Sequence, residues 1–212
     1  TGSMQQVWTN LNRMMITMLE TLVSDPFYNV RGEQIKPKIR VYYYRGNYRT
    51  QNVDDCVDEA GSMWYPKDDW ISTVDDVRNK EKVFQTISEL PKSFKNISIL
   101  INNAGLAWGL EPAHKIDIKK WETMIDTNCK GLIYMTKAVL PGFIKRNNGH
   151  IINIGSVAAS YPYAGGNVYG GTKSFVKQFS LGLKSDLLGT NVRITNIEPG
   201  MTNTEFSQVR FS

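Results

Sequence analysis

The amino-acid sequence predicts an α/β protein built on a doubly wound parallel sheet, and two features of the chain carry this prediction. From residue 76 onward, short apolar runs alternate with longer amphipathic stretches, which is typical of parallel strands joined by crossover helices. Glycine is concentrated in the same region, because thirteen of the 17 glycines lie between Gly105 and Gly200. With 212 residues, the chain is expected to form a single domain over residues 1–212.

Three buried strands are predicted at residues 97–101, 150–154 and 191–197, because each is a short run rich in isoleucine and valine. Each run ends in turn residues. These turns lie at residues 102–105, 155–156 and 198–200. Ligands of doubly wound folds bind beyond the carboxyl ends of the strands, so the three turns mark the expected site.

Two long helices are predicted between these strands. Asp117 can cap the first helix, which carries apolar side chains at helical spacing and is expected to end at Pro141 and Gly142. The second helix covers residues 168–188, with Gly189 just past its end, where a glycine commonly stops a helix.

The first 75 residues follow a different pattern. Asn10 can cap an amphipathic helix that stops at Asp25 and Pro26, and residues 38–53 indicate a β-hairpin. Residues 54–69 show no clean period and are expected to form a loop. Residues 1–4 are interpreted as an expression scar before a native start at Met4.

Composition excludes several classes of protein. No apolar stretch approaches the roughly 18 residues of a membrane helix, and no signal peptide opens the chain. Cys56 and Cys129 stand alone, which fits a reducing compartment, and two histidines make a His-based metal site unexpected. The net charge of +5 is spread along the chain without a basic run. We therefore expect a cytoplasmic protein without a metal, membrane or nucleic-acid partner.

A candidate catalytic pair lies on the second long helix. Tyr169 and Lys173 are four residues apart, so their side chains share one helix face. A lysine ammonium beside a phenol favours the phenolate, which lets a tyrosine act as general acid or base. Such a pair alone is weak evidence for a catalytic role. Ser156 directly after the second strand and Asn128 in the first helix strengthen this evidence.

The Asn-Asn-Ala-Gly turn, Asn128, Ser156, the Tyr169 and Lys173 pair and the Pro-Gly turn, in this order, resemble the short-chain dehydrogenase/reductase family. The resemblance runs from about Asp76 to the end of the chain and implies a Rossmann-like, three-layer α/β/α fold. Five stretches resemble the branch of NADP-dependent 3-hydroxy acid dehydrogenases in particular. They are residues 102–107, 111–115, 121–128, 161–170 and 204–207.

This resemblance implies a hydride transfer between NADP(H) and the 3-hydroxyl or 3-oxo group of serine, allo-threonine, 3-hydroxypropionate or malonic semialdehyde. Tyr169 would exchange a proton with the substrate oxygen, and Lys173 would stabilise the phenolate and bind the nicotinamide ribose. Ser156 would hold the substrate oxygen, and Asn128 would position a water that carries protons from Lys173.

The resemblance also implies the residues that contact the cofactor, which is expected to be NADP rather than NAD. Asp76 and Val77 would lie near the adenine, and the backbone after Pro199 and Gly200 near the carboxamide. The full expected set is Asp76, Val77, Asn103, Ala104, Gly105, Tyr169, Lys173, Pro199 and Gly200. Family members commonly pair through the long helices, so a homo-oligomer, either a dimer or a tetramer, is expected.

Residues 5–75 depart from the family pattern, because the glycine-rich phosphate loop is missing there. A divergent replacement, a chimera and an error in the sequence are three open explanations. The family also continues beyond the third strand, so residues 76–212 are expected to be a catalytic region whose C-terminal end is missing. One alternative function is a non-catalytic assembly or interaction protein without a working cofactor loop, and a weaker one is nucleic-acid binding by the tyrosine-rich and arginine-rich hairpin.

Overall fold

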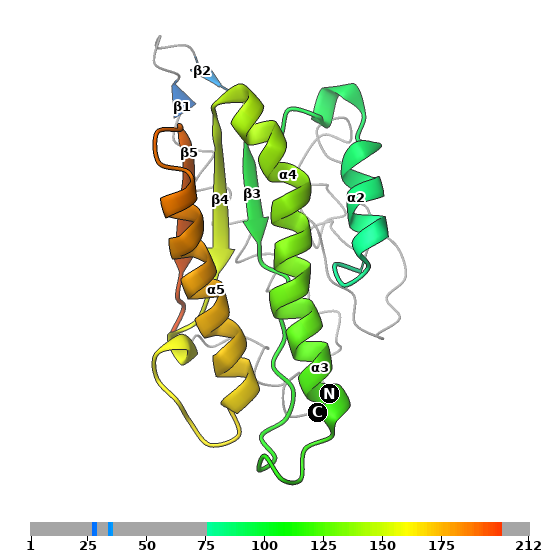
Figure 1. Ribbon diagram of the computed structural model, residues 1–212, viewed down its shortest axis with the longest axis vertical. Helices are drawn as coiled ribbons and strands as arrows, with labels where there is room; N and C mark the ends of the chain where they lie inside the picture. Colours follow the sequence, from blue (N-terminus) through cyan, green and yellow to red (C-terminus); the bar gives the residue numbers. More distant parts are fainter. Residues whose placement is uncertain (1–26, 29–33, 36–75, 201–212) are drawn as a thin grey trace, which may run out of the picture.

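The computed structural model describes residues 27–28, 34–35 and 76–200 (Figure 1). The elements among these residues follow in the order β1 (Phe27–Tyr28), β2 (Gln34–Ile35), α2 (Lys80–Ser88), the short helix η3 (Lys92–Phe94), β3 (Ile99–Asn102), α3 (Ile118–Ile125), the π-helical segment η4 (Asp126–Gly131), α4 (Leu132–Arg146), β4 (Gly149–Ile154), the short helix η5 (Val157–Ala159), α5 (Asn167–Asp186) and β5 (Val192–Ile197).

Strands β3, β4 and β5 form a parallel sheet with β4 in the centre. Ile99 pairs with His150, and Gly149 pairs with Val192. The β-branched residues of the three strands suit a pleated surface that is covered by other elements. The predicted α/β class is therefore confirmed, and each strand begins and ends within two residues of its predicted bounds.

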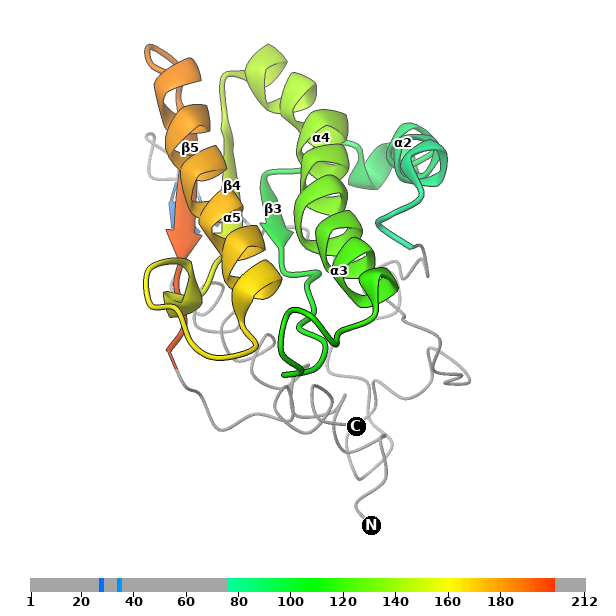
Figure 2. The same ribbon diagram turned by 60° about the horizontal axis from the view of Figure 1, so that its bottom comes forward.

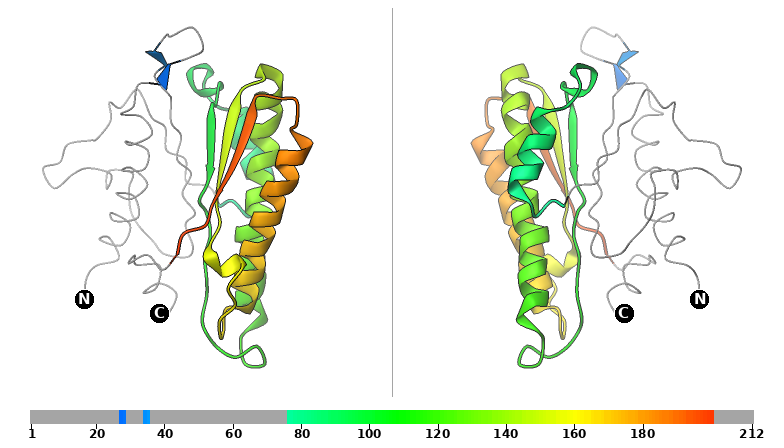
Figure 3. Two further views of the ribbon diagram at one scale, coloured as in Figure 1. Left: turned by 90° about the vertical axis from the view of Figure 1, so that its left-hand side faces the viewer. Right: turned by 90° about the vertical axis from the view of Figure 1, so that its right-hand side faces the viewer.

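Helices α2, α4 and α5 cover one face of this sheet, as the two side views in Figure 3 show. The described residues thus supply the sheet and one helical layer of the predicted three-layer arrangement. Between them lies an apolar core in which Phe143 and Ile151 have no exposed surface. Burying such side chains contributes roughly 1.5 to 3 kcal/mol each. The core consists of Val77, Val83, Leu100, Met135, Val139, Phe143, Ile151, Leu183, Leu187, Val192 and Ile194.

The first long helix begins where the sequence predicts, because the Asp117 side chain accepts a hydrogen bond from Lys119 N at 3.0 Å. Its predicted end at Pro141 and Gly142 is wrong, since α4 continues to Arg146. A proline removes only its own N–H from the helix ladder, and the buried Phe143 anchors the following turn in the core.

The helix ends instead at Asn147, whose φ of 48° places it in the left-handed conformation that often closes a helix. Residues 126–131 form a π-helical segment that was not predicted from the sequence. A π-helical turn of this kind is rare and frequently lies at a functional site.

Helix α2 was also not predicted, although the sequence carries its signals. The Asn79 side chain caps the helix by accepting a hydrogen bond from Lys82 N at 3.0 Å. Val83 and Ile87 are one turn apart, and both belong to or pack against the core. Asn79 and this apolar spacing together are the pattern that could have predicted the helix.

A buried network of amides and hydroxyls ties the sheet to the two long helices. Asn102 Nδ2 donates to Asn153 Oδ1 at 2.8 Å and to Thr136 Oγ1 at 3.2 Å. Asn153 Nδ2 donates to Ser180 Oγ at 2.8 Å. All four side chains are at most 8% exposed, so none can rely on bulk water for its hydrogen bonds. The network therefore fixes β3, β4, α4 and α5 relative to one another.

The predicted helix that begins after Asn10, the predicted hairpin at residues 38–53 and the predicted loop at residues 54–69 lie outside the described residues. Strands β1 and β2, which were not predicted, pair antiparallel with Phe27 opposite Ile35. None of the helices in the described ranges is both long and apolar enough to cross a membrane.

The buried network makes Ser180→Ala a test of the packing between β4 and α5. The variant leaves Asn153 Nδ2 without its acceptor in a site with no solvent access, so we expect a loss of about 1 to 3 kcal/mol in the free energy of unfolding. Urea denaturation measures this loss. The control is Ser185→Ala, an exposed serine on the same helix, which should cost less than about 0.5 kcal/mol. Equal costs for the two variants would contradict the role assigned to the network.

Candidate active site

The carboxyl ends of β3, β4 and β5 lie at one end of the sheet, next to the first turn of α5 (Figure 2). The turns that follow β4 and β5 are joined through their backbones. Gly155 N donates to Ile197 O at 2.7 Å, and Val157 N donates to Pro199 O at 3.1 Å. The chain segments that the sequence singled out as a site therefore do meet at one place.

Tyr169 and Lys173 lie on the same face of α5. Tyr169 is 8% exposed and packs with Ala107 and Met124 in a small apolar cluster. Lys173 follows one turn later, with its Nζ 5.8 Å from the centre of the Tyr169 ring. The phenol and the ammonium thus share one partly apolar environment.

The Lys173 ammonium is buried at the end of β4. Its Nζ donates to Ile154 O at 2.8 Å, and the residue is only 7% exposed. Burial lowers the pKa of Lys173 to about 8, an effect that the nearby Cys129 thiol partly offsets. An ammonium has three hydrogens to donate, and Ile154 O is its one hydrogen-bond partner among the described residues. The described residues therefore leave two of its donors unused.

Asn128 lies in the π-helical segment and is 2% exposed. Its Nδ2 donates to Leu106 O at 2.8 Å and to Thr172 Oγ1 at 2.9 Å, and its Oδ1 accepts from Leu106 N at 2.8 Å. The side chain therefore holds the backbone that follows β3 against α5. Both amide hydrogens are used in this way, and the expected role of Asn128 in positioning a water stays a prediction.

Ser156 follows β4 and opens the short helix η5. Its Oγ accepts a hydrogen bond from Ala158 N at 3.1 Å, which caps that helix. This contact occupies an oxygen lone pair and leaves the hydroxyl hydrogen to be donated. The hydrogen bond from Ala158 N fixes the position of this oxygen, and the half-buried residue is partly accessible to a ligand.

The turn after β3 passes directly beside these groups. A Cβ atom added to Gly105 would lie 3.4 Å from both Asn128 Oδ1 and Lys173 Nζ. Asn103 is half-buried, and Ala104 packs against the core. The backbone of residues 103–105 therefore passes next to the Lys173 ammonium, within van der Waals reach of a Cβ at position 105.

Asp76 and Val77 precede α2, and Val77 lies against the π-helical segment at Gly131. Burial would raise the pKa of Asp76, but hydrogen bonds from the Arg78 side chain and backbone outweigh it and lower that pKa. The Val77 side chain is 3% exposed and packs against Gly131, where an added Cβ would lie 2.7 Å from Val77 Cγ2. Val77 therefore has only its backbone to offer a ligand.

Within residues 76–200 and the two short strands before them, no three His, Cys, Asp or Glu side chains gather into a possible metal site. The described residues place a phenol and a buried ammonium side by side on α5, and a hydroxyl, that of Ser156, on the segment that follows β4. Together these groups can exchange and stabilise protons at a substrate oxygen.

Comparison with known sequences identifies related proteins. A sequence model described as short chain dehydrogenase matches residues 40–212, a range that begins before Asp76. The NADP-dependent 3-hydroxy acid dehydrogenase YdfG of Shigella flexneri is 58% identical over 164 residues, which are 77% of this chain and 64% of that protein. The serine 3-dehydrogenase of Rhizobium radiobacter is 55% identical over 162 residues, or 76% of this chain and 62% of that protein. The chain thus spans less than two thirds of the length of these relatives.

Similar solved structures indicate the same family and fold. The crystal structure of serine dehydrogenase from Escherichia coli matches with a TM-score of 0.62 and 62% identity, over 63% of this chain and 61% of that chain. A closed form of serine dehydrogenase complexed with NADP+ matches with a TM-score of 0.65 and 62% identity, over 67% of this chain and 58% of that chain. These similarities confirm the predicted Rossmann-like fold and the predicted family resemblance.

The lowered pKa of Lys173 predicts how stability depends on pH. Below pH 8 the lysine is protonated in both the folded and the unfolded chain. Between pH 8 and the ordinary value of 10.5, the folded chain has lost this proton while the unfolded chain still holds it, so stability rises with pH. From pH 7 to pH 10, we expect the free energy of unfolding of wild type to rise by roughly 2 to 3 kcal/mol more than that of Lys173→Met.

Denaturation by urea at several pH values measures this difference. Subtracting the Lys173→Met curve removes the contributions of most groups that titrate in both proteins. The Cys129 thiol is coupled to Lys173, but burial raises its pKa to about 11, so it stays protonated over most of this pH range in both folded proteins. A difference that stays constant across this pH range would show that the Lys173 charge is not desolvated in the folded protein.

Proposed function

The chain belongs to the short-chain dehydrogenase family, and from this membership we propose that it is an NADP-dependent oxidoreductase. Its reaction is the transfer of a hydride between NADP(H) and the 3-hydroxyl or 3-oxo group of a small 3-hydroxy acid. Residues 76–212 are proposed to be the catalytic region. The observation that carries the proposal is the buried Lys173 ammonium, which lies beside Tyr169 and has two donors that the described residues leave unused.

The proposed mechanism assigns each of these groups one task. Tyr169 exchanges a proton with the substrate oxygen, and the Lys173 ammonium stabilises the phenolate that forms when the proton leaves. Ser156 donates its hydroxyl hydrogen to the substrate oxygen and holds it next to Tyr169. When bound, NADP(H) supplies or accepts the hydride at the substrate carbon.

The described residues fit the nicotinamide and ribose end of this cofactor. The spare donors of Lys173 suit ribose hydroxyls, and the backbone of residues 103–105 passes beside them. The segment at Pro199 and Gly200, tied to η5 through Val157 N, would meet the carboxamide. Asp76 and the backbone of Val77 are proposed to contact the adenine. NADP is favoured over NAD because the relatives are named for NADP.

Serine, allo-threonine, 3-hydroxypropionate and malonic semialdehyde are the proposed substrates. The relatives named serine 3-dehydrogenase and 3-hydroxy acid dehydrogenase support this class. The expectation of a cytoplasmic enzyme continues to rest on the two isolated cysteines.

A homo-oligomer, a dimer or tetramer, is proposed to form through α4 and α5. Both helices carry large apolar side chains that are exposed in the single chain. Ile144 on α4 is 43% exposed, and Phe175 and Leu181 on α5 are 36% and 48% exposed. Pairing of these faces would remove apolar surface from water.

Tyr169→Phe tests the assigned acid and base. The variant keeps the ring that packs with Ala107 and Met124 but loses the hydroxyl, so turnover of L-serine with NADP+ should fall by at least about a hundredfold. Binding of NADPH should persist, and the quenching of tryptophan fluorescence measures it. Activity that survives in this variant would refute the assignment. A wild-type protein that fails to bind millimolar NADPH would favour the non-catalytic assembly protein instead.

Leu181→Lys tests the proposed oligomer interface. A charge on this exposed position of α5 should weaken assembly at least tenfold, because burying it in a contact between helices is costly. The matched control is Leu188→Lys, which makes the same substitution beyond the end of α5 at a residue that is 82% exposed. Sedimentation velocity over a range of concentrations reports the result. A monomeric wild type, or equal effects of both substitutions, would exclude this interface.

A further inference from the structure

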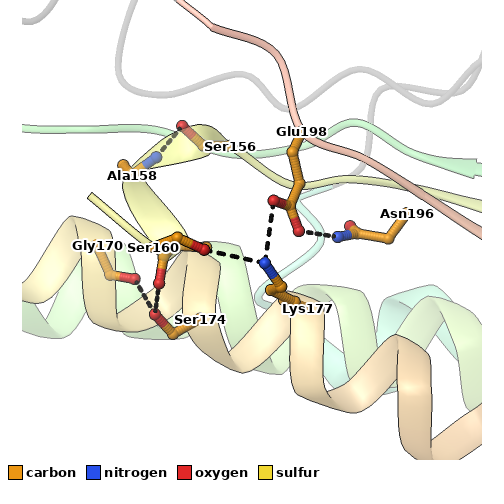
Figure 4. A network of polar contacts seen from close by, with 9 residues as sticks. Ser156, Ala158, Ser160, Gly170, Ser174, Lys177, Asn196 and Glu198 are labelled. Carbon is orange, nitrogen blue, oxygen red and sulfur yellow. Dashed lines mark hydrogen bonds and ion pairs between the residues drawn. The ribbon is translucent and has the colours of Figure 1, made fainter. Parts of the chain in front are cut away.

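The Lys177 ammonium lies where three segments of the chain meet, one helical turn beyond Lys173 on α5 (Figure 4). Its Nζ donates to Ser160 Oγ at 2.9 Å and contacts Glu198 Oε2 at 3.3 Å. Ser160 closes the short helix η5, and Glu198 directly follows β5. One side chain of α5 therefore holds both of the segments that extend from the ends of β4 and β5.

Further contacts surround this ion pair. Asn196 Nδ2 donates to Glu198 Oε1 at 2.9 Å, so both oxygens of the carboxylate are engaged. Ser174 Oγ donates to Ala159 O at 2.7 Å and fastens η5 to α5 a second time. As a result, the orientation of the Glu198 carboxylate is defined by α5 on one side and by β5 on the other.

The segments held in this way carry groups of the candidate active site. Ser156 is the first residue before η5, and Pro199 is the first residue after Glu198. Val157 N donates to Pro199 O, which links the two segments to each other. A shift of Glu198 away from α5 would therefore move Pro199, and with it Val157 and the neighbouring Ser156.

We propose that Lys177 and Glu198 are positioning residues, whose ion pair sets the distance between the helix of Tyr169 and the segments of Ser156 and Pro199. The proposal rests on the proposed oxidoreductase function, because that function gives these groups their tasks. The Lys177 and Glu198 side chains are 41% and 26% exposed, and ion pairs with that much exposure contribute little to global stability. The effect of the pair is therefore local.

The test compares Lys177→Met with Lys177→Arg and with Lys184→Met. Lys184 is an exposed lysine on the same helix, and it has no ion pair within the described part of the chain. Lys177→Met should lower kcat for L-serine about tenfold, because the orientation of Ser156 and Pro199 is lost. The KM for NADP+ should change by less than threefold, because Lys173 and the backbone of residues 103–105, which also bind the cofactor in the proposed function, are not held by Lys177. Lys177→Arg, which keeps the charge and the donors, should stay within twofold of wild type, and so should Lys184→Met.

Reversal of the pair gives a second test. Lys177→Glu alone should lower kcat at least as much as Lys177→Met, because it places two carboxylates together. Adding Glu198→Lys should restore most of the loss. The Asn196 Oδ1 atom, which is buried and has no partner among the described residues, can accept a hydrogen bond from the new lysine. A double variant no more active than Lys177→Glu would overturn the proposal.

Hydrogen exchange separates this inference from the proposed function. The amides of Val157, Ala159 and Ser160 should exchange several times faster in Lys177→Met than in Lys184→Met, with an unchanged melting temperature. If wild type shows no oxidoreductase activity, the proposed function fails, but faster exchange would still support the role of the Lys177 and Glu198 ion pair in holding these segments. Equal exchange and equal kcat in the two variants would reduce the pair to an ordinary surface salt bridge and overturn the inference.

Discussion

The burial of the Lys173 charge is the constraint on which the arrangement of the site depends. Removing an ammonium from water is costly unless hydrogen bonds compensate it, and Ile154 O at the end of β4 supplies such a bond. This bond requires α5 to pass close to the carboxyl end of the central strand. The close approach brings Tyr169 to the same place, and the turn at Gly105 passes next to the ammonium. The position of one charge thus limits the positions of a helix, a strand end and a loop.

Two kinds of polar contact maintain this arrangement. Deep in the fold, the Asn102, Asn153 and Ser180 side chains bond to one another without access to water, so their geometry is strongly determined. At the site itself, Asn128 bonds to both the N–H and the C=O of Leu106. The first set fixes the sheet against its helices, and the second fixes the loop against α5. The outer pair of Lys177 and Glu198 is more exposed and belongs to neither set.

The sequence predicted the elements whose patterns are repeated along the chain, namely the three parallel strands and the two long helices. The prediction from the sequence was wrong where a local feature competes with packing. Pro141 suggested a helix end, but the buried Phe143 keeps the helix intact. The spacing of Tyr169 and Lys173 predicted a shared face, since helical geometry fixes it. The contacts of Asn128 could not be predicted in this way. They depend on a π-helical turn and on a loop 22 residues away in the chain, and no local pattern encodes either.

Stability alone gives no reason for a lysine at position 173. A methionine of similar length would avoid the desolvation that lowers the pKa of this lysine to about 8. The chain nevertheless holds an ammonium there, and the described residues bond it once, through Ile154 O, and leave its remaining hydrogens unused. Sites at which a protein accepts such a cost are commonly functional ones. The cost of the buried charge is therefore itself an argument that its remaining donors serve a ligand.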